Sequence, residues 1–159
     1  MATEKEVWQA LKAVADPELP VISVVDLGVI RKVEVAGEAV RIAMTPTFSG
    51  CPAWDVMRRE VEAAVRRLGP AEVSVETVLH PPWSSDWISA EGRARLRELG
   101  LAPPPRHSGR PEVAFLEPAR CPDCGSERTT LTNAFGSGLC RALYVCQACG
   151  QPFERFKPL

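Results

Sequence analysis

The chain has 159 residues, which is enough for one ordinary domain or two small ones. Hydrophobic residues make up 45% of it and charged residues 25%, an ordinary globular composition that excludes disorder throughout. Lys and Arg number 19 against 20 Asp and Glu, and this near-balance argues against a general binder of nucleic acid or of membrane surfaces.

The first predicted element is a helix that begins after Thr3. Thr3 and Glu6 have the spacing of a capping box, and apolar residues then recur on one helical face at Val7, Leu11 and Val14. Asp16-Pro17 ends this pattern. The N-terminal sequence MATEKEVWQA lacks the apolar core of a secretory signal, so we expect the chain to stay in the cytoplasm.

Three strands and two further helices are expected next. Residues 29–35 and 39–44 flank a short Gly-containing turn and predict a β-hairpin. A helix is expected from Pro52 to the Gly69-Pro70 stop, followed by an alternating strand over 72–78. Ser89 is expected to cap a last helix, which ends near Leu99. This order predicts an α+β fold, with a small three-stranded sheet covered by helices.

The composition changes after residue 101. Residues 102–112 are rich in proline, which suits an extended linker, and five of the six cysteines lie beyond residue 120. We therefore expect an α/β domain over 1–101, a linker over 102–112 and a cysteine-rich mini-domain over 113–159. In a chain expected to stay in the cytoplasm, these cysteines indicate metal or thiol chemistry rather than a disulfide framework.

Two copies of one motif mark the cysteine-rich tail, namely Cys121-Pro-Asp-Cys124-Gly and Cys146-Gln-Ala-Cys149-Gly. Two intervening residues let both sulfurs of a pair reach one metal, and the following glycine permits the left-handed turn around it. The gap between the pairs is long enough for a hairpin. We expect a zinc-ribbon site with one metal per chain; zinc is favoured, and iron, as in rubredoxins, is the alternative.

Cys140 lies between the two cysteine pairs and allows two interpretations. It is either a small buried hydrophobic residue or an additional thiolate that serves as a ligand near the metal or for an iron–sulfur cluster. The spacing does not decide between them.

Cys51 lies between a predicted strand and the helix that starts at Pro52, at the expected N-cap of that helix. The free N–H groups and partial positive charge of a helix N-terminus favour a thiolate, which is a nucleophile or a soft metal ligand. Hydroxyl side chains, including Thr47, flank the approach to this sulfur. Cys51 is therefore the candidate reactive thiol.

Carboxylates in two predicted loops add to this candidate site. Asp16, Glu18 and Asp26 either act only as turn-formers or surround the same end of the sheet as Cys51. Asp26 and Thr47 are the residues that we group with Cys51. The chain has only two histidines, so it offers little for a cysteine-dependent hydrolase.

Three segments, DPELP (16–20), VVDLGVI (24–30) and TPTFSGCP (45–52), resemble the family of metal–sulfur cluster biosynthesis factors. That family contains small α/β iron–sulfur assembly and maturation proteins. The segment 80–104 and the cysteine-rich tail resemble one branch more closely, which is associated with a multicomponent phenylacetyl-CoA epoxidase.

The resemblance implies an accessory protein rather than an enzyme. It implies help in assembling an iron–sulfur or metal centre of the epoxidase in aerobic phenylacetate degradation, with the oxygenase and the flavin/iron–sulfur reductase as protein partners. It further implies that Cys51 is the reactive cysteine and that Cys121, Cys124, Cys146 and Cys149 bind zinc. We expect no nucleic-acid or membrane partner.

A transient iron–sulfur cluster at Cys51 would need further ligands, because clusters are usually held by four cysteines. A homodimer, a partner protein or Cys140 would have to supply them. Two other functions remain open. One is a rubredoxin-like electron carrier with iron in the tail. The other is a nucleic-acid binder, although residues 106–159 carry seven Lys or Arg against five Asp or Glu, a weak phosphate-binding footprint.

Overall fold

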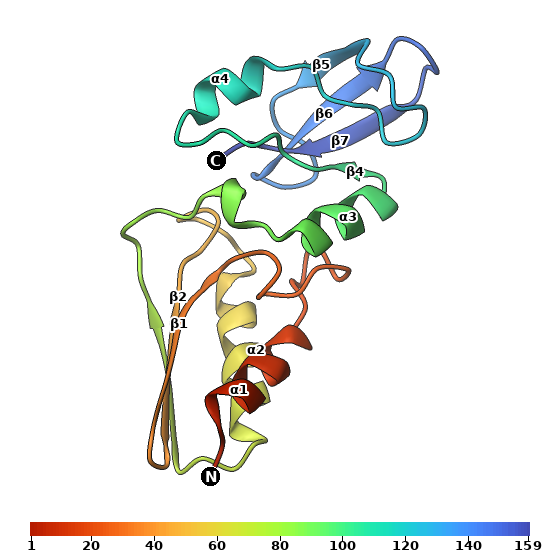
Figure 1. Cartoon of the computed structure of the whole chain (residues 1–159). Helices are drawn as coiled ribbons and strands as arrows, with labels where there is room; N and C mark the ends of the chain where they lie inside the picture. Colours follow the sequence, from red (N-terminus) through yellow and green to blue (C-terminus); the bar gives the residue numbers. More distant parts are fainter. The chain divides into compact units, whose positions relative to one another are not determined.

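The computed structural model describes all residues from Met1 to Leu159 and divides them into two compact units, Met1–Trp83 and Ser84–Leu159. The first unit contains α1, β1, β2, α2 and β3, and the second contains η1, α3, β4, α4, β5, β6 and β7 (Figure 1). No helix combines the length and apolar character that a membrane crossing requires.

Helix α1 (Glu4–Lys12) opens the first unit with the predicted capping box. The Thr3 hydroxyl accepts a hydrogen bond from the main-chain N–H of Glu6, and the Glu6 carboxylate accepts one from the N–H of Thr3 at 2.8 Å. Val7 and Leu11 are buried on the inner face of the helix. A capping box satisfies N–H groups that the first helical turn leaves unpaired, so the start of α1 is defined by local sequence.

The first unit contains the predicted three-stranded sheet. Strands β1 (Ile30–Ala36) and β2 (Ala39–Met44) pair in an antiparallel hairpin, and Gly37 in their turn has a positive φ of 62°. Strand β3 (Glu72–Thr77) pairs with β2 in parallel, which places β2 in the middle.

Helix α2 (Trp54–Arg66) makes the crossover that the parallel β2–β3 pair requires. Met57, Val61 and Val65 are buried on one face of α2. The two helices α1 and α2 lie on one face of the sheet (Figure 1). The predicted α+β fold class, with a three-stranded sheet and covering helices, is confirmed.

A turn-rich segment joins α1 to β1 and contributes much of the apolar core. Buried apolar side chains recur along it, at Leu19, Ile22, Val24, Leu27 and Val29. Trp83 is also buried, and its indole N–H donates to the carbonyl oxygen of Leu27 at 3.0 Å. This segment is therefore an integral part of the first unit.

The second unit begins with the 3₁₀ helix η1 (Ser85–Trp87) and helix α3 (Ala90–Glu98). Ser89 caps α3 as predicted, because its hydroxyl accepts from the N–H of Gly92 at 2.9 Å. Strand β4 (Leu101–Ala102) and helix α4 (Pro111–Leu116) follow.

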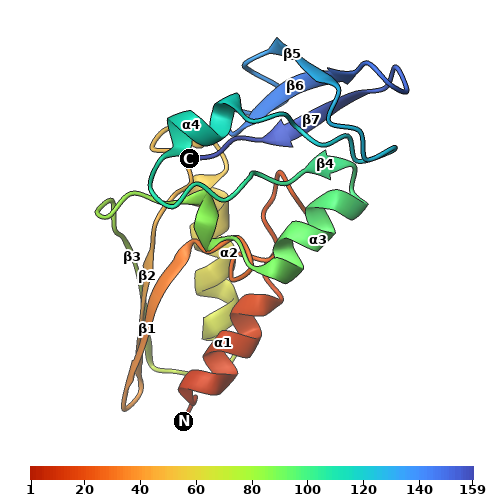
Figure 2. The same ribbon diagram turned by 45° about the horizontal axis from the view of Figure 1, so that its top comes forward.

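A four-stranded sheet with the order β4-β7-β6-β5 forms the rest of the second unit (Figure 2). Strands β5 (Thr129–Asn133) and β6 (Arg141–Cys146) make the hairpin expected between the two cysteine pairs. Strand β7 (Pro152–Phe156) pairs with β6 in antiparallel and with β4 in parallel orientation.

The division between the units differs from the predicted linker over 102–112. Strand β4 is a member of the second sheet, and the Asp86 carboxylate accepts from the main-chain N–H groups of His107 at 3.0 Å and Ser108 at 2.8 Å. Residues 84–110 thus make their pairings inside the second unit. The proline-rich composition predicts an extended linker. The pairing of β4 with β7 and the hydrogen bonds to Asp86 instead hold this segment within the second unit.

Candidate metal centre and reactive thiol

Two matching turns present the four tail cysteines. Each turn is closed by a main-chain hydrogen bond of 2.9 Å, from Gly125 N–H to the Cys121 carbonyl and from Gly150 N–H to the Cys146 carbonyl. Both glycines have positive φ values, 73° and 78°, which side chains disfavour. The repeated CxxCG motif therefore folds twice into the same metal-binding knuckle.

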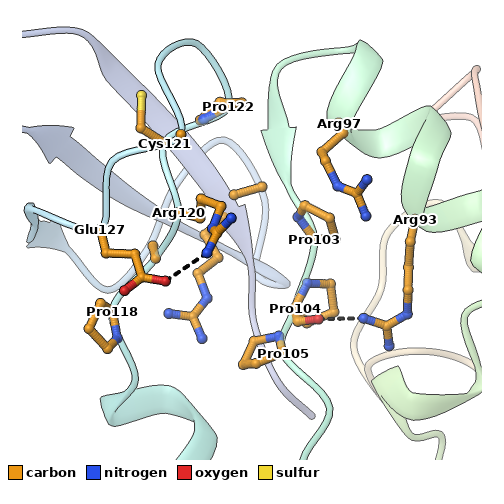
Figure 3. Close-up of a pocket in the computed structure, with 14 residues that line it drawn as sticks. Arg93, Arg97, Pro103, Pro104, Pro105, Pro118, Arg120, Cys121, Pro122 and Glu127 are labelled. Carbon is orange, nitrogen blue, oxygen red and sulfur yellow. Dashed lines mark hydrogen bonds and ion pairs between the residues drawn. The ribbon is translucent and has the colours of Figure 1, made fainter. Parts of the chain in front are cut away.

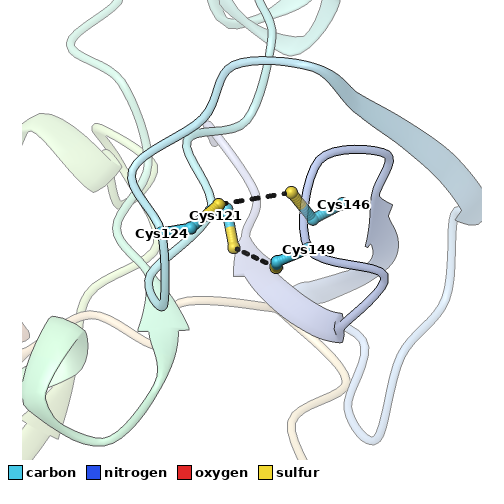
Figure 4. Close-up of side chains that lie close together, drawn as sticks. All are labelled: Cys121, Cys124, Cys146 and Cys149. Carbon is cyan, nitrogen blue, oxygen red and sulfur yellow. Dashed lines mark hydrogen bonds between the residues drawn. The ribbon is translucent and has the colours of Figure 1, made fainter.

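The four Sγ atoms of Cys121, Cys124, Cys146 and Cys149 all lie within 4.8 Å of one another (Figure 4). The Sγ–Sγ distances are 3.8 Å for Cys121–Cys149 and 3.6 Å for Cys124–Cys146. Four sulfurs placed about 2.3 Å from a common centre would be about 3.8 Å apart, so the group fits a tetrahedral metal ion. These distances are too long for disulfide bonds.

The pKa values of the thiols in this group differ widely. Main-chain hydrogen bonds, first from Cys149 and then from Ala148, help to lower the pKa of Cys146 to about 6. A main-chain hydrogen bond from Gln151 favours the Cys149 thiolate, but burial and the neighbouring sulfurs outweigh it and raise that pKa to about 12. The Cys146 thiol thus loses its proton readily and can act as a ligand, whereas a metal ion must displace the proton of Cys149 before that sulfur binds it.

Cys140 does not belong to the four-sulfur group. It immediately precedes β6, whereas Cys146 ends that strand, and six residues of strand span roughly 20 Å. Cys140 is half-buried, and its carbonyl oxygen accepts from the N–H of Lys157 at 2.8 Å. Its thiol therefore lies too far along the sheet to bind the same ion.

Cys51 precedes α2, but the predicted N-cap position is wrong. The N-cap of α2 is Ala53, and Cys51 lies in the preceding turn, where its N–H donates to the Phe48 carbonyl at 3.1 Å. The carbonyl of Cys51 accepts from the N–H of Trp54 at 3.2 Å. The thiol is half-buried.

The prediction of a lowered pKa for Cys51 is also wrong. Burial raises the pKa of this thiol above its usual value, and the negative charges of Glu18 and Asp16 raise it further. Main-chain hydrogen bonds from Ala53 and Trp54 favour the thiolate but do not outweigh these effects. The Cys51 thiol therefore keeps its proton at neutral pH.

The carboxylate environment of Cys51 comes from the turn after α1. Asp16 is buried, and its carboxylate accepts from the main-chain N–H groups of Glu18 at 2.7 Å and Leu19 at 3.1 Å. These bonds hold the DPELP turn in a fixed conformation. Because Glu18 and Asp16 act on the Cys51 thiol, they are the loop carboxylates that the structure associates with it.

Asp26 and Thr47 are the residues that the sequence pattern associates with Cys51. The Asp26 carboxylate accepts from the Ser23 hydroxyl at 2.8 Å, and the Asp26 N–H donates to that hydroxyl at 3.0 Å, as in a turn-forming role. Thr47 is half-buried in the segment between β2 and α2. In that segment Thr45 is only 1% exposed, and its hydroxyl has no hydrogen-bond partner.

Comparison with protein families gives two matches. Residues 4–77 match the sequence model of a family described as iron–sulfur cluster assembly proteins. Residues 108–157 match a family described as the PaaD zinc beta ribbon domain. The first range covers α1 to β3 with the Cys51 turn, and the second contains all four tail cysteines.

Named relatives agree with these matches. The chain is 44% identical over 153 residues to an Escherichia coli K12 protein named as a subunit of 1,2-phenylacetyl-CoA epoxidase, covering 96% of this chain and 91% of that one. It is 35% identical to an Fe-S protein maturation auxiliary factor of Porphyromonas gingivalis, covering 64% of this chain and 94% of that one.

Two solved structures resemble the fold. A domain of unknown function from Bacillus anthracis has a TM-score of 0.55 and 31% identity, covering 58% of this chain and 90% of that one. A conserved hypothetical protein from Thermotoga maritima has a TM-score of 0.53 and 31% identity, covering 60% and 94%. The resemblance inferred from the sequence motifs is confirmed.

Proposed function

Because the chain belongs to the iron–sulfur cluster assembly family, in the branch with a C-terminal PaaD-type zinc ribbon, we propose that it is an accessory maturation factor of a phenylacetyl-CoA epoxidase complex. In this proposal it performs no turnover of its own. It assists the insertion of an iron–sulfur or other metal centre into the oxygenase or the flavin/iron–sulfur reductase of aerobic phenylacetate degradation.

The extent of the similarity carries this proposal. The relative named as an epoxidase subunit matches 96% of the chain and therefore both units, whereas the maturation factor of Porphyromonas gingivalis matches only 64% of it. Residues 4–77, which match the iron–sulfur cluster assembly family, lie in the unit that holds Cys51, so we assign the general maturation role to that unit. The metal-binding unit is the part that directs the protein to one client complex.

Zinc is the proposed occupant of the four-cysteine site. The sulfur spacing fits a zinc ion, and four protein ligands fill its tetrahedral coordination, which leaves no open position for a substrate. Zinc held in this way supplies folding energy and no redox chemistry. Cys121 and Cys146 are buried in the core of the second unit, which agrees with a structural role.

Cys51 is the proposed ligand for the cargo. Its thiol is protonated in the resting protein, so an arriving iron ion must displace the proton before an iron–sulfur bond forms. The neighbouring Glu18 and Asp16 carboxylates attract the cation but also favour reprotonation of the sulfur. Weak, reversible binding of this kind suits transfer to a client.

A single thiolate cannot hold a cluster, so the cargo site must be completed from elsewhere. We propose that a second copy of the chain or a cysteine of the client supplies the remaining ligands. In this arrangement Cys140 is not required, and the cluster remains labile until the client binds it.

The test uses cells that lack this protein and express the epoxidase components. Wild-type protein, Cys51→Ser and Cys140→Ser are supplied separately, and epoxidase activity is measured in extracts together with the iron content of the purified oxygenase and reductase. We expect Cys51→Ser to fold normally but fail to restore activity, and Cys140→Ser to restore it. Full restoration by Cys51→Ser would remove Cys51 from the mechanism.

A further inference from the structure

A pocket of about 420 Å³ opens in the second unit, outside both sites described above. Prolines 103–105 form one wall, and Pro118 and Pro122 contribute to the other (Figure 3). Helix α3 supplies two arginines, β7 supplies a third, and the residue before the first cysteine knuckle supplies the fourth. The volume falls within the range usual for small-ligand pockets.

The pocket carries an excess of positive charge. Arg93, Arg97, Arg120 and Arg155 line it, and Glu127 is the one acidic residue among the lining residues. Glu127 is already paired with Arg120 at 2.9 Å. Three guanidinium groups therefore remain without a carboxylate from the lining.

Arg93 and Arg155 are buried charges, with exposed fractions of 8% and 2%. Neither forms an ion pair. They donate to main-chain carbonyl oxygens: those of Ser85, Ile88 and Pro104 for Arg93, and those of Ala114 and Glu117 for Arg155. These bonds fix the two side chains, but they leave a net positive charge, and buried charges are normally paired.

Arg97 completes the cluster from the outer face of α3. Its guanidinium group makes no hydrogen bond or ion pair, and the side chain extends beside Arg93 toward the proline wall (Figure 3). Burial lowers the pKa of Arg93, and the positive charges of Arg106 and Arg97 lower it further, while the negative charge of Asp86 offsets part of this effect. A bound anion would relieve this repulsion.

The chemistry of the walls selects the kind of anion. Phosphate sites commonly use several main-chain N–H groups, but proline has none, so the proline walls cannot provide such a cradle. The donors are guanidinium groups, whose planar N–H pairs match carboxylates and phosphates alike, so the missing main-chain cradle is what favours a carboxylate. Proline rings also offer apolar surface to the methylene groups of a glutamate side chain.

We propose that this pocket binds carboxylate side chains of an acidic segment in a client protein. The assignment of that segment to a client rests on the proposed maturation function, whereas carboxylate binding itself does not. Because the first cysteine knuckle forms one wall, the pocket is complete in the metal-loaded protein.

The test measures binding of a fluorescent peptide of alternating Glu and Gly to the full-length, metal-loaded protein, with a Gln and Gly peptide as the uncharged control. Arg97→Gln removes a guanidinium without removing a contact, and Arg95→Gln is the matched control, since Arg95 lies on the same helix outside the pocket and pairs with Glu91. We expect Arg97→Gln to weaken binding about tenfold, as for one lost charge-assisted contact, and Arg95→Gln to leave it unchanged.

Equal weakening by the two substitutions, or equal binding of the two peptides, would overturn the proposal. So would inorganic phosphate that displaces the peptide at concentrations below those at which the peptide binds, because the site would then be a phosphate site. Failure here is separable from failure of the proposed function. The Cys51→Ser test in cells does not involve the pocket, and peptide binding does not involve the epoxidase.

Discussion

Replacing Cys146 by serine removes one of the four sulfurs from the metal site. The substitution therefore tests whether the metal ion stabilises the fold of the second unit. The core cluster around the site contains only two large side chains, Tyr144 and Phe153, whose rings stack with centroids 5.7 Å apart. Burial of such side chains is worth roughly 1.5–3 kcal/mol each. A structural zinc ion contributes about 10–16 kcal/mol in small zinc-folded units, so the metal stabilises the region around the four cysteines more than these two rings do.

We therefore expect Cys146→Ser to unfold the region from Ala119 to Phe156 while the first unit remains folded. Amide hydrogen exchange followed by mass spectrometry measures both units in one experiment. Amides of β6 and β7 should lose their protection, and those of α1 and α2 should keep it. Cys140→Ser is the control, because Cys140 lies outside the four-sulfur group. Protected β6 and β7 amides in Cys146→Ser would refute the reasoning.

Two further predictions concern the thiol and the ribbon loop. Glu18→Gln removes a negative charge that raises the Cys51 pKa, so iodoacetamide should alkylate Cys51 faster at pH 8. The control is Glu38→Gln, a substitution of an exposed residue, which should not change the alkylation rate. An unchanged rate in Glu18→Gln would mean that Glu18 does not act on the thiol. A Cβ atom at Gly136 would lie 2.5 Å from Oε1 of Glu154 and would push that carboxylate away from Ser137 and Arg141. Gly136→Ala should therefore lower the free energy of unfolding by about 1 kcal/mol in denaturant titrations, and wild-type stability would contradict a fixed Glu154 carboxylate.

Local sequence signals predicted most helices and turns of the first unit and the start of α3 in the second, because each signal acts within a few residues. The Thr3–Glu6 capping box, the Gly37 turn and the Ser89 cap all appear where their motifs placed them. The two CxxCG motifs likewise fold into matching knuckles without help from distant residues. In each case the determining hydrogen bond joins residues that are close in sequence.

Features that depend on distant residues were not predictable in this way. The Cys51 pKa is raised partly by Glu18 and Asp16, which precede it by more than thirty positions and meet it only in the folded unit. Similarly, β4 joins the second sheet by pairing with β7, and no local pattern in the proline-rich segment signals that pairing. Tertiary contacts, rather than local propensity, decide both outcomes.

The central claim is that Cys51 receives iron–sulfur cargo while the tail holds zinc. The most direct test incubates the metal-loaded protein with ferric iron, a thiol reductant and sulfide without oxygen, removes the unbound reagents, and measures zinc, iron, sulfide and visible absorption for wild type and Cys51→Ser. We predict one zinc per chain in both proteins, with labile iron and sulfide in the wild type alone. Iron that replaces zinc in the tail, with a rubredoxin-like spectrum kept in Cys51→Ser, would contradict the account and identify an electron carrier.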